Sequence, residues 1–235
     1  MKKFILILLF AMTALNLSAS EKWEHSLSLG FNKTKGNSET EQLNSDYKGK
    51  RKWLKANALF SLYVNSGKEN QVETTQNYGA DFQYNRYLSE RLYWLVNTSY
   101  KIDKQADLEG RFLLGPGLGY SFMKNAKSAL DFEAGVSYLQ TKYDMVASQN
   151  DTAVRIAENY SRKLSDTAKL WQSAEYLASA DDTDEYIFDA ELGVEAKLTA
   201  SFNLKTFINN KYTNRPASNK KNNDTAFTTM LVYTF

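Results

Sequence analysis

The sequence predicts an all-β protein, an antiparallel transmembrane β-barrel of about twelve strands that follows a cleaved amino-terminal signal peptide. Three observations favour this fold. Residues 1–20 have the pattern of an export signal. Many later segments alternate between apolar and polar side chains with a period of two, the spacing of a strand with one face in lipid. The links between these segments alternate in length, as in membrane barrels.

The amino terminus has the parts of a secretory signal peptide. Lys2 and Lys3 are basic, residues 4–17 are almost entirely apolar, and small residues follow them. The apolar part is too short to cross roughly 30 Å of hydrocarbon as a helix, so cleavage is favoured over a retained anchor. We therefore expect a signal peptide at residues 1–20 and one barrel domain at residues 21–235.

Cleavage would leave a chain without net charge. Removing Lys2 and Lys3 from the 29 basic side chains leaves 27, against 27 acidic ones. A neutral chain lacks the basic surface that binding to nucleic acid requires, so we expect no nucleic-acid partner. The sequence has no cysteine, which excludes disulfides, thiolate metal ligands and a lipidated amino terminus. We expect neither a cofactor nor a bound metal.

The clearest internal strand is at residues 186–198. Apolar and polar side chains alternate along the whole segment, and a helix of the same residues would have charges on every side. The apolar face consists of Tyr186, Phe188, Ala190, Leu192, Val194, Ala196 and Leu198. The same pattern predicts strands at residues 23–32, 56–64, 78–85, 94–102, 114–122 and 130–138.

Three segments have a weaker pattern. Residues 41–50 are polar on both faces, with Leu43 and Tyr47 as candidates for the lipid side. Residues 154–164 and 168–178 are rich in Ala, Lys, Glu and Leu and could instead form helices. We favour strands for all three, because the total is then about twelve, an even number that suits a closed single-chain barrel.

The chain ends in an alternating strand at residues 227–235, with Tyr233 and Phe235 on the same face. A terminal aromatic residue on such a strand resembles the end of bacterial outer-membrane barrels. The resemblance implies that Tyr233 and Phe235 form a signal for the barrel-assembly machinery. It also implies an outer-membrane location in a Gram-negative envelope, with outer-membrane lipid around the protein.

The predicted strands are joined by alternately longer and shorter links. The longer links are residues 33–39, 65–71, 103–109, 141–152, 179–184 and 213–223, and the tight ones lie near Lys52 and at 89–91, 124–127, 165–167 and 199–201. Barrels have short periplasmic turns and longer outside loops, so both chain ends should be periplasmic. Aromatic residues near strand ends suit an interfacial belt: Trp23, Trp53, Tyr84, Trp94, Tyr120, Tyr186 and Tyr233.

Three glycines, Gly115, Gly117 and Gly119, fall on the polar face of the strand at residues 114–122. There they would leave lumen space for large side chains across the barrel, or allow the strand to curve. A nucleotide-binding loop is a poor explanation, because such glycines open a helix after a strand.

Candidate chemistry is sparse, and we predict no catalytic residue. His25, the only histidine, shares a face with Trp23, so we expect it at a membrane interface rather than beside a nucleophile. The acidic residues Asp181, Asp182, Asp184 and Glu185 could attract a divalent cation, but a solvated loop is favoured, since they lack the spacing of a calcium loop. Charges on the inward faces could pair across the lumen or line a small pore: Lys55, Asp81, Arg111, Asp131, Glu133, Asp189, Glu191, Glu195, Lys197 and Lys205.

Several motifs occur in a fixed order along the chain. They are WEHSLSLG at residues 23–30 with GNSET at 36–40, Arg111 with LGPGLGY at 114–120, Glu133-Ala134-Gly135 with Tyr138, and finally Tyr212, Pro216, Asp224-Thr225 and Tyr233-Thr234-Phe235. Together they resemble the salt-induced outer-membrane protein family, a domain of unknown function, over about residues 23–235. The resemblance implies an outer-membrane barrel with a role in salt or osmotic adaptation, and it supplies no catalytic residue and no substrate.

The leading hypothesis is a non-enzymatic outer-membrane barrel that acts as an envelope structural protein or as a narrow, porin-like channel. One alternative is an outer-membrane barrel enzyme that hydrolyses lipid or peptide. The other is a secreted soluble β-sandwich that binds a ligand. The sequence leaves open whether the lumen is open or plugged, which solute passes and what the oligomeric state is.

Overall fold

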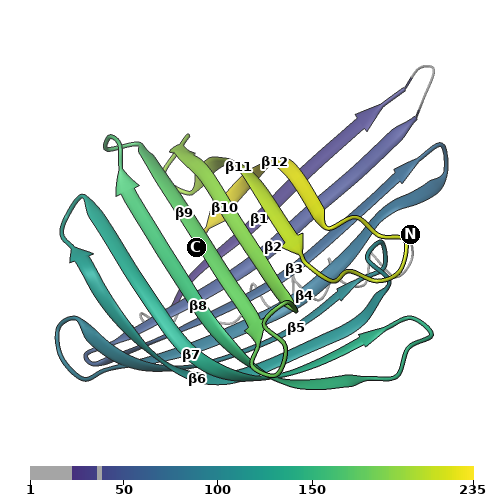
Figure 1. Ribbon diagram of the computed structural model, residues 1–235. Coiled ribbons are helices and arrows are strands. Elements are labelled where there is room, and N and C mark those ends of the chain that lie inside the picture. The colour runs from purple at the N-terminus through teal and green to yellow at the C-terminus, as the bar shows by residue number, and fades with distance from the viewer. Residues whose placement is uncertain (1–22, 36–38) are drawn as a thin grey trace.

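The chain folds into a closed antiparallel β-barrel (Figure 1). The computed structural model describes residues 23–35 and 39–235, which form twelve strands. Within the same ranges, no helix is long and apolar enough to cross a membrane. The strands are β1 (Trp23–Thr34), β2 (Thr40–Trp53), β3 (Ala56–Glu69), β4 (Val72–Tyr87), β5 (Leu92–Asp103), β6 (Leu108–Lys124), β7 (Ser128–Tyr143), β8 (Gln149–Lys163), β9 (Ala168–Ser179), β10 (Tyr186–Lys197), β11 (Phe202–Thr213) and β12 (Asn223–Thr234).

Two predictions fall outside the described residues. One is the signal peptide at residues 1–20, and the other is the part of the GNSET motif at residues 36–38. The barrel domain is therefore described from Trp23 onward, apart from this short gap.

Each strand pairs with its neighbours in the sequence, and β1 pairs with β12 to close the ring. The predicted twelve-stranded barrel is confirmed, and the β-sandwich alternative is wrong, because one continuous sheet returns to its first strand. The helical alternative for residues 154–178 is also wrong. In β8 the two-residue period exposes Val154 and Ile156 on the outer surface and buries Ala153 and Ala157 on the lumen side.

The alternation along each strand separates the outer surface from the lumen. In β12, Phe227 and Leu231 face outward and are 73% and 45% exposed, whereas Met230 and Val232 face inward and are buried. A barrel in lipid has this arrangement, because the hydrocarbon contacts only the outer face. The buried apolar core lies inside the barrel, where β6 to β9 contribute Leu113, Leu139, Ala153 and Leu177.

The connections follow the predicted length pattern only in part. We call the end of the barrel where β1 begins and β12 ends the terminal end, and the opposite end the loop end. At the loop end β3 and β4 are joined only by Asn70 and Gln71, where a longer link was predicted. The strands continue to this turn because both residues have positive φ angles, 48° and 68°, which match the twist of a two-residue hairpin.

Closure of the barrel depends on a short ladder between β1 and β12. Four residues, 26–29, pair with residues 231–234, whereas β1 pairs with β2 along its whole length. The backbone of His25 adds two hydrogen bonds to Phe235, of 3.0 and 3.1 Å. We call this closing pair of strands the seam.

A buried ion pair crosses the seam on the lumen side. Lys205 Nζ of β11 lies 2.8 Å from Asp46 Oδ1 of β2, and Ser28 Oγ of β1 donates to Asp46 Oδ2 at 2.6 Å. The two charged side chains are only 9% and 12% exposed. Because β11 and β2 flank the seam, these contacts tie together the two sides of the shortest ladder.

Asp46→Asn should therefore lower the free energy of unfolding by about 2 kcal/mol, because it leaves the Lys205 charge buried without its partner. Urea unfolding of the protein refolded into lipid vesicles would measure this change. The matched control is Lys52→Gln, which removes an exposed pair with Glu24 and should cost less than about 1 kcal/mol. Equal losses in the two variants would show that the seam contact has no special role.

Candidate transport pathway

The lumen contains a cavity of about 1010 Å³. Side chains from strands all round the barrel border it, and many of them are polar or charged. It extends to the terminal end, where Glu24, Lys50 and Thr234 are among the lining residues. At roughly 30 Å³ for each water molecule, the cavity has room for on the order of tens of waters or for a small solute.

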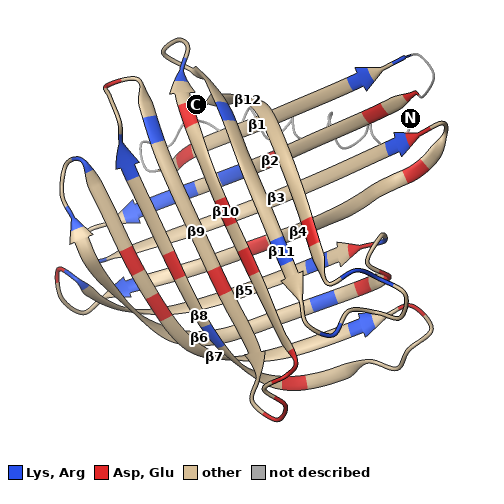
Figure 2. Ribbon diagram, turned by 45° about the horizontal axis from the view of Figure 1, so that its top comes forward, with Lys and Arg blue, Asp and Glu red and all other residues tan. Residues whose placement is uncertain are grey.

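The charges that were predicted to face inward do so, with one exception. Lys55 lies in the two-residue turn between β2 and β3 at the terminal end, so the prediction for this residue is wrong. Most of the others have polar partners on neighbouring strands. Asn209 donates to Asp189 at 2.8 Å, and Asn203 donates to Glu195 at the same distance. Figure 2 shows acidic and basic residues spread along the barrel wall.

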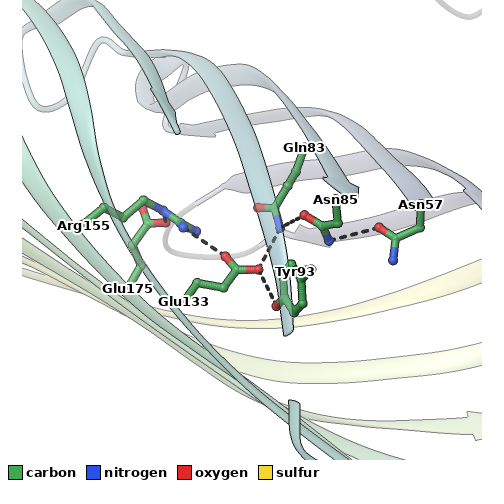
Figure 3. Close-up of polar contacts among 7 residues, drawn as sticks. All are labelled: Asn57, Gln83, Asn85, Tyr93, Glu133, Arg155 and Glu175. Atoms are coloured by element: carbon green, nitrogen blue, oxygen red, sulfur yellow. Dashed lines mark hydrogen bonds and ion pairs between the residues drawn. The ribbon is translucent and has the colours of Figure 1, made fainter. Parts of the chain in front are cut away.

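Two deeply buried charged residues, Glu133 and Arg155, belong to one network along the wall (Figure 3). Arg155 of β8 donates to Glu133 of β7 at 3.0 Å and to Glu175 of β9 at 2.7 Å. Glu133 also accepts hydrogen bonds from Gln83 of β4 and from the Tyr93 hydroxyl of β5, at 2.8 and 3.0 Å. Buried carboxylates are stable when they are paired and hydrogen-bonded, and both carboxylates of this network have donors.

Gly119 of β6 makes this network possible. Gly119 pairs with Tyr93 of β5 on one side and with Glu133 of β7 on the other. A Cβ atom on Gly119 would lie 2.1 Å from Tyr93 Cζ, which is a steric clash. Because β6 has no side chain at this position, the Tyr93 hydroxyl reaches over the strand to Glu133.

The predicted role of the glycines was therefore right in kind and wrong in detail. Gly119 does make room for a large side chain, but the ring comes from the adjacent strand rather than from across the barrel. A Cβ atom on Gly115 or Gly117 would instead meet Ser137 or the backbone of β7.

The pairing of a glycine with an aromatic ring on the adjacent strand recurs at two other places. Tyr63 covers Gly79, and Trp171 covers Gly193 while its indole N–H donates to Glu191 at 2.7 Å.

The loop end of the lumen is narrower. Lys211 Nζ of β11 lies 3.8 Å from Asp103 Oδ2 of β5, although these strands are on opposite sides of the ring. The loop at residues 214–222 follows β11, and its Lys220 Nζ lies 2.9 Å from Asp107 Oδ1 in the β5–β6 connection. One ion pair therefore spans the lumen, and the loop above it is tied to the far side of the mouth.

The acidic loop between β9 and β10 is held by an arginine. Arg215 forms ion pairs with Asp182 and with Asp184, the second at 3.8 Å, and the Arg215 hydrogen bond lowers the pKa of the Asp182 carboxyl below its usual value. No group of three or more His, Asp or Glu side chains in residues 23–35 and 39–235 is arranged to hold a metal ion. These contacts favour a role in anchoring the 214–222 loop.

Two lysines of β2, Lys48 and Lys50, border the cavity. Neither lies within 4.0 Å of a carboxylate of the described residues, whereas the nearby Lys52, Lys169 and Lys205 each have an acidic partner. The terminal half of the lumen therefore contains two lysines that form no ion pair within 4.0 Å among the described residues.

His25 lies in an aromatic cluster at the terminal end of the outer surface. Its ring stacks with those of Trp23, Tyr47 and Phe235, at centroid distances of 5.9, 5.8 and 5.5 Å. A hydrogen bond of 2.8 Å joins its Nδ1 atom to the Tyr47 hydroxyl. The predicted grouping of His25 with Trp23 on one face is confirmed.

Sequence reasoning missed Arg155, Glu175, Tyr93 and Lys211. Arg155 and Glu175 lie in the segments for which a helix was left open, so their inward direction was not predicted. A usable signal was present, because Arg155 lies between Ala153 and Ala157 on one face of β8. Small neighbours of this kind leave room for a long side chain to point into the lumen.

Gly119→Ala should lower the free energy of unfolding by about 1–3 kcal/mol, since the new methyl group displaces the Tyr93 ring and breaks its hydrogen bond to Glu133. The loss should be smaller when Tyr93→Ala is already present. Urea unfolding of the two single variants and the double variant gives this coupling directly. Strictly additive losses would contradict the proposed contact.

The model of the family described as "Protein of unknown function, DUF481" matches residues 27–235. The chain also resembles the COG4313 outer membrane channel from Pseudomonas putida F1, with a TM-score of 0.56 and 8% identity over 91% of this chain and 95% of that one. Its TM-score to the NanC porin is 0.50, with 8% identity over 89% and 97% of the two chains. No curated protein matches this chain. At such identities the structural likeness concerns the fold, and the family match shows that the chain belongs to the DUF481 family.

Proposed function

We propose that this protein is a non-enzymatic outer-membrane channel with a narrow, water-filled lumen. The observation that carries the proposal is the cavity of about 1010 Å³, which is lined by paired and unpaired charges and reaches the terminal end. A plug made only of side chains would fill this space. A lumen of paired charges suits passive movement of small hydrophilic solutes, because water and ions find polar partners along the wall.

The outer-membrane location is supported by the outer surface of the barrel. Apolar side chains face outward along the strands, and aromatic rings gather at the terminal end, as a membrane interface favours. Export would use the signal peptide expected at residues 1–20. Tyr233 and Phe235 are 37% and 42% exposed, so both rings are accessible to the assembly machinery proposed to recognise the last strand.

The proposed path is wide at the terminal end and narrow at the loop end. The Lys211–Asp103 pair and the tethered loop at residues 214–222 form the constriction. A channel of this shape should conduct weakly, and its conductance should depend on these contacts. Two structural neighbours, the COG4313 outer membrane channel and the NanC porin, agree with this proposal.

The same constriction favours one other function, a closed structural barrel in the envelope. In that case the ion pair across the lumen would stabilise the wall and no solute would pass. The link to salt or osmotic adaptation stays a prediction of the family resemblance under either function. We expect no hydrolytic activity, because the contacts of His25 are aromatic.

Single-channel recording in planar bilayers separates these two functions. We expect small, steady channels from the refolded protein, and about twofold higher conductance when Asp103→Ala and Lys211→Ala remove the pair that spans the lumen. The matched control is the pair Glu109→Ala and Lys142→Ala, which removes an ion pair outside the cavity lining and should not change conductance. Silence from every variant would instead support the structural barrel.

The unpaired lysines predict a preference for anions. In a potassium chloride gradient the reversal potential should show chloride entering more readily than potassium, because Lys48 and Lys50 attract anions to the wide half of the lumen. Lys48→Gln combined with Lys50→Gln should remove most of this preference, and Lys142→Gln should leave it unchanged. A cation preference in the unmodified protein would contradict the assignment.

A further inference from the structure

The outer surface at the terminal end holds an arginine between tryptophans. Arg51 Cζ lies 4.7 Å from the ring centroid of Trp53 and 5.7 Å from that of Trp23. The Arg51 Nε atom is buried and has no hydrogen-bond partner among the described residues. Arg51 also has no carboxylate of the described chain within 4.0 Å, so the rings hold a guanidinium whose charge is not neutralised.

A second outward arginine lies two strands away. Arg51 of β2 pairs with Ala58 of β3, and Arg86 of β4 pairs with Ala56 of β3. Both alanines, Ala56 and Ala58, are on the outer face and are only 5% and 3% exposed, because the longer side chains around them cover them. We call this surface the rim patch, and it consists of Trp23, Arg51, Trp53, Ala56, Ala58, Tyr84, Arg86 and Trp94.

Tyr84 connects the rings of the rim patch. Its ring centroid lies 6.3 Å from that of Trp53 and 5.6 Å from that of Trp94. Tryptophan and tyrosine prefer the boundary between hydrocarbon and headgroups, because each has an apolar ring and a polar group. The rings therefore place both arginines at the depth where lipid phosphates lie.

The surroundings of the rim patch are basic. Figure 2 shows basic residues at the terminal ends of β2 and β4. Lys55 and Arg91 lie in the adjacent turns with one acidic residue, Glu90, and the acidic Glu24 is already paired with Lys52. An anionic ligand would find complementary charge here, and an arginine can form two parallel hydrogen bonds to one phosphate.

We propose that the rim patch binds the phosphate group of an anionic phospholipid in the leaflet at the terminal end. A phospholipid fits better than a soluble phosphate ion. The rings of Trp53 and Trp94 are 42% and 38% exposed and offer apolar contact to the glycerol and upper acyl chains, which a free ion cannot use. This proposal rests on the barrel and its outer surface, and it holds whether or not the lumen conducts.

The test uses quenching of tryptophan fluorescence by brominated lipids. The refolded protein is placed in phosphatidylcholine vesicles that contain either brominated phosphatidylglycerol or brominated phosphatidylcholine. We expect the anionic lipid to quench more strongly at equal mole fraction. Arg51→Gln and Arg86→Gln should each lower this preference about fivefold, and excess inorganic phosphate should leave it unchanged.

The matched control is Arg162→Gln. Arg162 is also an exposed arginine near the terminal end, but it lies on β8 and has no cation–π contact in the described part of the chain. A heat-dependent gel shift verifies the folding of each variant. If Arg51→Gln does not fold, Arg86→Gln alone is used for the quenching test. The proposal is overturned if the preference survives both rim variants, if Arg162→Gln lowers it equally, or if inorganic phosphate abolishes it.

Discussion

The whole architecture depends on the pairing of β1 with β12. A strand in hydrocarbon cannot leave its backbone N–H and C=O groups without partners, so an open sheet of these strands would have two costly edges. The seam removes both edges with only a short ladder and the bonds between His25 and Phe235. The Lys205–Asp46 pair adds side-chain contacts where the backbone offers few, which explains why this buried charge is tolerated in the lumen.

The lumen performs the role that an apolar core has in a soluble protein. The outer face of the barrel is suited to contact lipid. The chain must therefore stabilise the interior of the barrel with polar side chains that also contact water. The Glu133–Arg155–Glu175 network does this on one side, and the apolar cluster around Leu113 and Leu139 does it nearby. The two kinds of packing leave space between them, and this space is the cavity on which the proposed channel depends.

The sequence predicted the fold well because a membrane barrel repeats one simple pattern. The period of two at residues 186–198 and 227–235 identifies a strand without knowledge of its neighbours. The length of the β3–β4 turn could not be predicted in this way, since it depends on positive φ angles at Asn70 and Gln71. Contacts such as Lys211 with Asp103 were beyond reach, because strand order alone does not show how far two side chains extend across a lumen.

The row formed by Tyr93, Gly119 and Glu133 also has an evolutionary consequence. Three adjacent strands share one space, and the bare backbone in the middle is what lets the outer two side chains meet. A larger residue at position 119 can be accepted only if position 93 becomes smaller. Among family members these two positions should therefore change together, although they are far apart along the chain and neither has any chemical reactivity of its own.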